Sequence, residues 1–359
     1  MEERYKLTLL LSLASISAIG ILYILIYIFK KTPPKYYDSP DIECGTERIE
    51  NTEKLGDKQK EEELIRFRGA QDLSVYDILD APGEVIGKSG YGTLYRANLL
   101  TCDSVAVLRF LRPVCTGETK ETEAIIRVLG SIRHSNLVPL QAFYAGSKGE
   151  KLLVHPFYGG GTLAHFIRDG NCESYKWDTI HEISIGIAKG LYHLHSGFQK
   201  PIIIHGNLKS KNILLHQNNF QPQISDFGLH LVLNPTAGQE MLQVSASQGY
   251  KAPELIKMKD VSKETDVFSL GIIFLELLSR KEPLGEEYYL PNTMRDAIME
   301  RRIADLYHPH IVLGLNRDEI GTMEERILKF FQIAMACCSP SQSLRPQMKQ
   351  VLRGLEEID

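Results

Sequence analysis

Two short motifs, separated by about 115 residues, constrain the fold of this 359-residue chain more than any other feature. The first, Val85–Tyr95, is typical of a strand, a tight glycine turn and a second strand, because glycine tolerates the backbone angles of such turns. The second, His205–Asn212, is followed fourteen residues after Asn212 by Asp226–Gly228. A glycine turn alone is weak evidence, but the two motifs in this order and at this spacing predict one domain that contains both.

Together the motifs resemble those of protein kinases. The stretch from Ser74 to Leu355 is similar to the kinase domain of plant leucine-rich-repeat receptor-like kinases, and the helical rhythm that ends in Gly190–His195 agrees with that family. The resemblance implies an α+β, bilobal fold. We expect an N-lobe built from an antiparallel sheet and one helix, and a mainly helical C-lobe.

The resemblance places Asn207 where the family's catalytic loop carries an aspartate that accepts the proton of the substrate hydroxyl. An amide stays neutral at any working pH and cannot act as a general base. The neighbouring Lys209 matches the lysine that contacts the transferring phosphate, and Asn212 and Asp226 match the two Mg²⁺ ligands. The chain is therefore expected to keep the family's residues that contact phosphate and metal but to lack its catalytic base.

The resemblance also assigns residues to nucleotide binding. Gly87, Gly90 and Gly92 match the loop that covers the phosphates. At the linker between the lobes, His155 matches the residue at the back of the pocket, and Tyr158 is expected to contribute to the same site. A histidine that is simply packed in the core is an equal alternative for His155.

The strand Ser104–Arg109 carries a larger change. Its family form ends in a lysine that holds the α- and β-phosphates, and the match places Leu108 at that position. Because side chains alternate along a strand, Arg109 is expected to point to the other face, unless a register slip of one residue brings it inward. The helix glutamate that pairs with this lysine falls on Ile125. Both members of a buried ion pair are thus expected to be aliphatic, a paired change that is often neutral for stability.

The framework of the C-lobe is expected to be intact. Glu254 matches a family residue that pairs with the position of Arg345, and Asp266 opens the hydrophobic helix that anchors the catalytic loop. Gly206 replaces the family's arginine that reads phosphate on the activation segment, so phosphorylation is not expected to switch the domain in that manner. We expect the activation segment, which carries Thr236, to be a solvated loop.

Residues 7–29 form a run of 23 positions without a charged side chain. A helix needs roughly 20 residues to cross a bilayer core, whereas the apolar part of a signal peptide, the alternative, has about 7–15 residues. Lysines directly after the run favour a cytosolic location for the C-terminal part. The expected order is an extracytoplasmic stub 1–6, a transmembrane helix 7–29, a juxtamembrane linker 30–71 and a kinase-like domain 72–357, with its N-lobe at 72–155 and its C-lobe at 159–357.

Composition excludes little but agrees with this reading. A net charge of −4 gives no indication of nucleic acid as a partner. The six cysteines lack the spacing of a metal site or a disulfide framework, so we expect them to be reduced.

These features favour a single-pass pseudokinase of the plasma membrane with a cytoplasmic kinase-like domain. It is expected to act as a signalling scaffold or allosteric partner of active receptor-like kinases, with ATP and Mg²⁺ bound weakly or not at all. The alternative is a weakly active or atypical Ser/Thr protein kinase that transfers phosphate from ATP to protein hydroxyls, with Lys88 or Arg109 replacing the missing lysine. Loss of a positioned base alone costs roughly 10²–10⁴-fold in rate, so the sequence disfavours activity but leaves it open.

Overall fold

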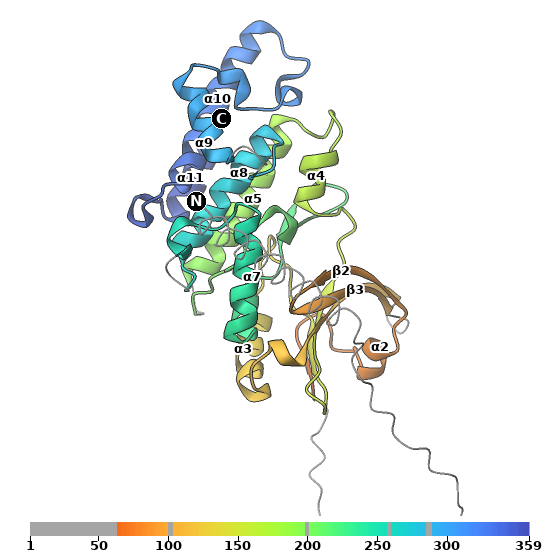
Figure 1. The fold of residues 1–359 in the computed structure, drawn as a ribbon. Coiled ribbons are helices and arrows are strands. Elements are labelled where there is room, and N and C mark those ends of the chain that lie inside the picture. The colour runs from red at the N-terminus through yellow and green to blue at the C-terminus, as the bar shows by residue number, and fades with distance from the viewer. Residues whose placement is uncertain (1–62, 100–102, 198–200, 257–259, 285–288, 359) are drawn as a thin grey trace, which may run out of the picture. The chain divides into compact units, whose positions relative to one another are not determined.

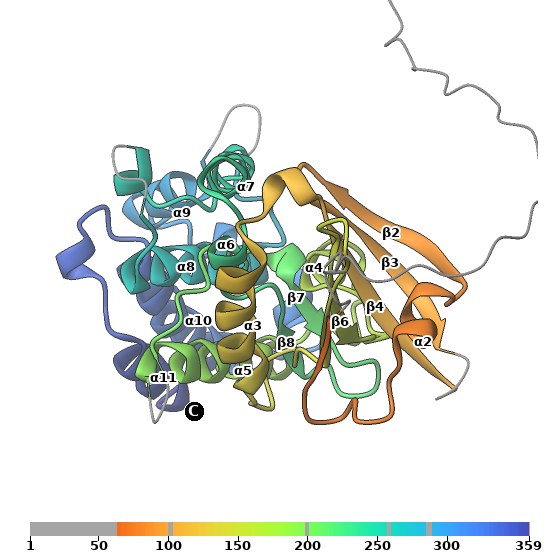
Figure 2. The ribbon, with the colours of Figure 1, turned by 90° about the horizontal axis from the view of Figure 1, so that it is seen from below.

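The structure is a computed structural model that describes residues 63–99, 103–197, 201–256, 260–284 and 289–358. It has the predicted α+β, bilobal architecture, with a sheet-based N-lobe and a helical C-lobe (Figures 1 and 2). The proposed membrane run, residues 7–29, lies outside the described residues. Among the helices that are described, none is both long enough and apolar enough to span a membrane.

The N-lobe contains a six-stranded antiparallel sheet with the strand order β1-β5-β6-β4-β3-β2. Its strands are β1 (Glu63–Arg66), β2 (Gly83–Ser89), β3 (Gly92–Leu99), β4 (Ser104–Leu111), β5 (Ala142–Ala145) and β6 (Lys151–Pro156). The first strand lies inside the stretch 30–71 that was expected to be a linker. Ile65 of this strand is buried in the core. The strand has only two apolar residues, Leu64 and Ile65, between Glu63 and Arg66, and such a short run does not identify a strand from sequence.

Two helices, rather than the expected one, pack on the N-lobe. Helix α2 (Val75–Leu79) starts at a capping box on Ser74 and buries Ile78 in a cluster with residues of β3, β4 and β6. Helix α3 (Thr119–Ser131) contributes Ile126 and Leu129 to a different cluster, which continues into the C-lobe. The alternating side chains of the sheet therefore fill two separate cores, one on each face.

The C-lobe is built around helix α8 (Lys263–Ser279), in which every residue from Thr265 to Ser279 is buried. The other helices are α4 (Leu163–Asp169), α5 (Trp177–Ser196), α6 (Leu229–Val232), α7 (Pro235–Ser247), α9 (Leu290–Met299), α10 (Arg317–Cys337) and α11 (Met348–Glu356). A two-stranded ribbon joins β7 (Ile213–Leu215) to β8 (Pro222–Ile224). Short 3₁₀ turns occupy Pro113–Cys115, Ser210–Asn212, Pro253–Ile256, Ile303–Asp305, Pro309–Val312 and Gln342–Leu344.

The activation segment is not the solvated loop that we expected. It forms α7, which lies where the two lobes meet (Figures 1 and 2). Asn234 caps the helix by accepting a hydrogen bond from the backbone N–H of Ala237, and Pro235 occupies the first turn, where its missing N–H costs nothing. Ala237 and Met241 are buried, so packing adds to the local capping signal.

The apolar core between α2 and the sheet generates a stability prediction. Leu108 is 3% exposed within that core, whereas Leu79 on α2 is 46% exposed. We expect Leu108→Lys to lower the free energy of unfolding by at least about 3 kcal/mol, because it buries a charge without a partner. The matched change Leu79→Lys should alter it by less than about 0.5 kcal/mol. Urea denaturation of both variants measures the difference, and equal effects would contradict this placement of Leu108.

Candidate functional site

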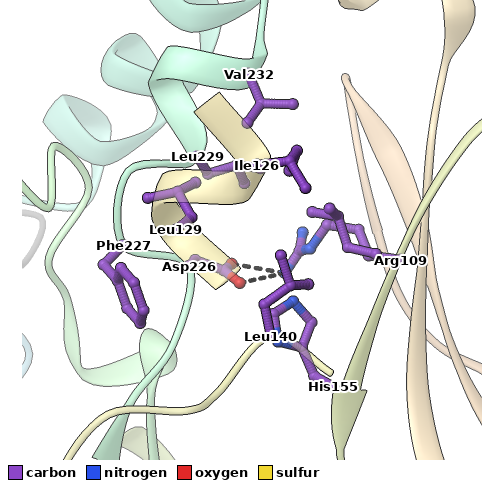
Figure 3. Close-up of a pocket in the computed structure, with 10 residues that line it drawn as sticks. Arg109, Ile126, Leu129, Leu140, His155, Asp226, Phe227, Leu229 and Val232 are labelled. Carbon is purple, nitrogen blue, oxygen red and sulfur yellow. Dashed lines mark hydrogen bonds and ion pairs between the residues drawn. The ribbon is translucent and has the colours of Figure 1, made fainter. Parts of the chain in front are cut away.

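A buried ion pair between Arg109 and Asp226 joins the two lobes (Figure 3). Nη2 of Arg109 lies 2.6 Å from both carboxylate oxygens of Asp226. The two side chains are only 7% and 10% exposed, so solvent screens this pair little. Removing one partner of such a pair strands a charge in the interior, which typically costs about 3–5 kcal/mol.

The register of β4 explains why Arg109 reaches this place. Arg109 pairs with Leu153 of β6, on the face that looks toward α3, while Leu108 pairs with Val154 on the opposite face. The expectation that Leu108 faces the nucleotide site and Arg109 points away is therefore wrong, and the one-residue slip describes the strand correctly. The cause is the apolar core under α2, which takes up the leucine and leaves the arginine facing Asp226.

Helix α3 does not supply the partner of this cation. Ile126 and Leu129 face the ion pair (Figure 3). Ile125 is only half-buried and packs at the edge of the same core. The expected aliphatic pair of Leu108 and Ile125 does not form, because the two residues belong to different cores. The carboxylate that neutralises Arg109 comes instead from the C-lobe.

The surroundings of the ion pair are apolar and tightly filled. A cavity of about 30 Å³ lies beside it, lined by Arg109, Asp226, His155 and a ring of aliphatic and aromatic side chains. Asp226 adopts a left-handed backbone conformation, with φ of 64°, which aspartate tolerates better than most residues. Phe227, the next residue, is 8% exposed and packs into the same wall.

His155 lies in this wall as a partly buried, neutral imidazole. Its Nδ1 is 3.1 Å from the carbonyl oxygen of Pro139. Burial, with a further contribution from Arg109, lowers the pKa of His155 to about 4. Tyr158, assigned to the same site from sequence, does not line the cavity; burial raises the pKa of its phenol.

The glycine turn has a tight backbone at one of the three predicted positions. A β-carbon on Gly92 would lie 2.3 Å from the carbonyl oxygen of Phe110, so a side chain there would displace β4. At Gly87 and Gly90 the nearest atoms would be 3.3 and 3.4 Å away, which is less restrictive. Tyr91, between Gly90 and Gly92, turns inward, with its ring centroid 6.0 Å from the guanidinium carbon of Arg109.

Asp266 holds the backbone of the catalytic loop, His205–Asn212, in place. This buried carboxylate accepts hydrogen bonds from the backbone N–H groups of His205 and Gly206, at 2.7 and 2.9 Å, and lies 2.9 Å from Nε2 of His195. These hydrogen bonds and the nearby histidines hold the pKa of Asp266 below its usual value despite burial. The anchoring role expected for the helix that carries Asp266 is thus present.

Asn207 sits on this loop, but it is sealed from solvent. It is 4% exposed, its N–H donates to Nδ1 of His205, and its Oδ1 finds no hydrogen-bond donor among the described residues. Its carbonyl accepts a hydrogen bond of 2.9 Å from the side-chain amide of Asn212. Lys209 donates to Gln248 at 3.3 Å, and burial lowers the pKa of that lysine.

These contacts do not fit a bound Mg²⁺ ion or its nucleotide. Both oxygens of Asp226 are engaged by the guanidinium of Arg109, whereas Asn212 donates a hydrogen bond only from its side-chain nitrogen, to the carbonyl of Asn207. A metal ion would have to displace Arg109 first, which leaves the arginine buried without a partner. The structure therefore brings Asp226 and Arg109 together, so a protein cation occupies the carboxylate that was expected to bind Mg²⁺.

Sequence reasoning missed His230. A β-carbon on Gly206, whose φ is 78°, would lie only 2.5 Å from the buried Nδ1 of this partly buried histidine. The imidazole thus takes the space next to the loop, and only glycine fits opposite it. No motif signalled this contact, although the loss of arginine at position 206 was visible in the sequence. The expected pair of Glu254 and Arg345 is confirmed, with nitrogen–oxygen distances of 2.6 and 2.8 Å.

The depressed pKa of His155 predicts acid sensitivity. The folded state favours neutral imidazole, so the unfolded chain binds more protons between about pH 6.5 and pH 4. The free energy of unfolding should fall as the pH drops through this range, with His155 contributing about 3 kcal/mol by its lower end. Denaturant titrations of wild type and His155→Leu across this range measure that contribution. Parallel pH profiles for the two proteins would contradict it.

Comparisons with known proteins agree with this fold. The family model described as protein kinase domain matches residues 81–354. The Arabidopsis thaliana protein named "Putative kinase-like protein TMKL1" is 36% identical over 91% of this chain and 48% of its own length. Another relative from the same plant, whose name describes it as a probable inactive receptor kinase, is 33% identical over 82% of this chain and 45% of its own length. The chain thus spans less than half the length of these relatives.

Solved structures show the same fold. The kinase domain of maize SIRK1, a sucrose-induced receptor kinase bound to AMP-PNP, superimposes with a TM-score of 0.72 at 26% identity, over 82% of this chain and 99% of that one. The pseudokinase domain of BIR2, an immune regulator of the RLK/Pelle family, gives a TM-score of 0.59 at 28% identity, over 76% of this chain and 79% of that one. The chain belongs to the protein kinase family, and its relatives are the leucine-rich-repeat receptor-like kinases and inactive receptor kinases of Arabidopsis.

Proposed function

We propose that this chain is a membrane-anchored receptor-like pseudokinase, which acts as a signalling scaffold or allosteric partner of active receptor kinases. The observation that carries the proposal is the ion pair of Arg109 with Asp226. It places a protein cation on the carboxylate that an active kinase uses to bind Mg²⁺. The domain then holds its lobes together without a nucleotide, and binds ATP and Mg²⁺ weakly or not at all.

The catalytic loop supports the same proposal. Asn207 stands in place of the general base, and its amide is buried under the activation segment. Loss of the base costs roughly 10²–10⁴-fold in rate, and loss of the metal removes electrostatic stabilisation of a similar order. Against a usual turnover of about 1–100 s⁻¹, these losses bring phosphate transfer close to background.

The names of the relatives point in the same direction. One relative is described as an inactive receptor kinase, and one structural neighbour is described as a pseudokinase domain and an immune regulator. The maize neighbour was solved with AMP-PNP, so the shared fold can hold a nucleotide in that protein. In this chain the same region would need Arg109 to release Asp226 before metal could enter.

Membrane attachment is part of the proposal. Residues 7–29 would span the bilayer and the kinase-like domain would lie on the cytosolic side, as the lysines after the span favour. The receptor-like relatives support partners of the same class, active receptor kinases in the plasma membrane. The alternative, a weakly active Ser/Thr kinase, requires Mg²⁺–ATP to open the ion pair during turnover.

Nucleotide titration of the purified full chain tests the proposal. We expect millimolar ATP with Mg²⁺ to shift the melting temperature by less than about 1 °C, because a ligand stabilises only a state that it binds. Radiolabelled phosphate transfer should equal that of Asp226→Asn, with the fold of the variant checked by circular dichroism. Lys209→Met provides a second control. Magnesium-dependent stabilisation together with transfer that disappears in both variants would overturn the pseudokinase assignment.

A further inference from the structure

One face of helix α5 borders an open hollow of about 290 Å³ that shares no lining residue with the site described above. Its lining from α5 is Lys189, Tyr192, His193 and Ser196, whose helical spacing places them on the same side of the helix. His134, in the connection between α3 and β5, also lines the hollow. None of the described residues that line it carries a carboxylate. A lysine, two imidazoles and a phenol suit an anion rather than a cation.

The two imidazoles lie against each other at the hollow. The ring centroids of His134 and His193 are 4.8 Å apart, with the ring planes tilted by 32°. Nδ1 of His134 accepts a hydrogen bond of 3.0 Å from the backbone N–H of Asn136, so the proton of the neutral ring lies on Nε2. Burial, followed by His193 and Lys189, lowers the pKa of His134. A bound anion would offset the effect of these two basic neighbours.

Lys189 is available to a ligand at little cost. Its Nζ lies 3.7 Å from a carboxylate oxygen of Glu356 on α11, and the two side chains are 47% and 49% exposed. Such a long, solvent-screened contact contributes little to stability, so the ammonium group can turn toward an anion. Lysine is a common phosphate ligand, and charge-assisted hydrogen bonds to phosphate are stronger than neutral ones. The hollow therefore fits a phosphate group.

A groove of about 550 Å³ shares Lys189 with the hollow and is lined further along α5 by Glu182 and Gly186. Asn219 and Gln221, from the connection between β7 and β8, also line this groove. Glu182 precedes Lys189 by seven residues, which corresponds to about 10 Å along the helix axis. About three residues of an extended peptide cover that distance. The groove thus has a basic end at the hollow and an acidic residue at peptide distance from it.

We propose that the hollow and the groove form a docking surface for a phosphorylated segment of a partner protein. The phosphate of a phosphoserine or phosphothreonine would lie beside Lys189 and the two imidazoles, and a basic residue about three positions away would lie beside Glu182. This proposal rests on the proposed function, because active receptor kinases produce such segments. A free phosphate or a lipid headgroup would fill the hollow but use neither the groove nor Glu182.

Fluorescence anisotropy of a labelled peptide with the purified full chain tests the docking surface. The probe is an alanine peptide with a central phosphoserine and an arginine three positions away on each side, so either chain direction presents a basic residue to Glu182. We expect it to bind at least about tenfold more tightly than the same peptide without phosphate. Equal affinity for the two peptides would overturn the proposal.

Two substitutions locate the phosphate. Lys189→Met keeps most of the side-chain length, and His193→Phe keeps a ring against His134. Each should weaken binding of the phosphorylated probe about fivefold, the effect of one lost hydrogen bond to a charged group. Lys281→Met, at an exposed lysine after α8, is the matched control and should bind as wild type does. Equal effects of Lys189→Met and Lys281→Met would contradict the assignment.

A charge reversal tests the groove. Wild type should prefer the probe with arginines over one with glutamates in their place by about threefold, as expected for an exposed charge pair. Glu182→Lys should reverse this preference. Free O-phosphoserine or inositol 1,4,5-trisphosphate that displaces the probe as well as unlabelled peptide does would overturn the peptide surface and indicate a site for small phosphates or lipid headgroups.

Failure of the docking surface and failure of the pseudokinase assignment give different results. Radiolabelled phosphate transfer by Lys189→Met should equal that of wild type, because Lys189 lies outside the catalytic loop. Transfer by wild type, together with phosphopeptide binding that Lys189→Met weakens, would retain the docking surface and refute the pseudokinase assignment. Silent transfer without a preference for the phosphorylated probe would refute the docking surface alone.

Discussion

The closed arrangement of this domain depends on a guanidinium meeting a carboxylate across the two lobes. In an active kinase, Mg²⁺ and nucleotide phosphates would compensate Asp226; here Arg109 does so from within the chain. The pair is almost fully buried, so its attraction is strong, but so is the cost of desolvating both charges. Its net contribution to stability is therefore modest, while loss of either partner is severe. Because an unpaired partner costs so much, the ion pair favours one state in which the two lobes are closed on each other, and no ligand is needed to form it.

The rest of the framework is preserved because it serves the fold. Asp266 still holds the catalytic loop by its backbone, and the Glu254–Arg345 pair still joins the end of the activation segment to the helical core. Neither contact depends on catalysis. Gly206 and His230 show how the loop has adapted, since the imidazole fills space that a side chain at position 206 would need.

The sequence was sufficient to predict the fold and the Glu254–Arg345 pair, and insufficient to predict that Arg109 neutralises Asp226. Motifs with fixed spacing identified Asn207, Asp266 and the partner of Glu254, because these lie on segments whose geometry the fold determines. The register of strand β4 could not be predicted in this way, because a shift of one residue moves every side chain to the opposite face of the sheet. The apolar core under α2 takes up Leu108, and this leaves Arg109 on the face toward Asp226. Helix α7 was missed because its stabilising contacts come from residues distant in sequence, although the cap and proline at its start were visible.

A double-mutant cycle on the ion pair tests the account most directly. Arg109→Met and Asp226→Asn remove each charge with little change in size, and urea denaturation of the two single variants and the double variant gives the coupling energy. We predict a loss of roughly 3–5 kcal/mol for each single change. The double variant should lose at least about 2 kcal/mol less than the sum of the two. Strictly additive losses would show that the two charges do not depend on each other, and would contradict the account.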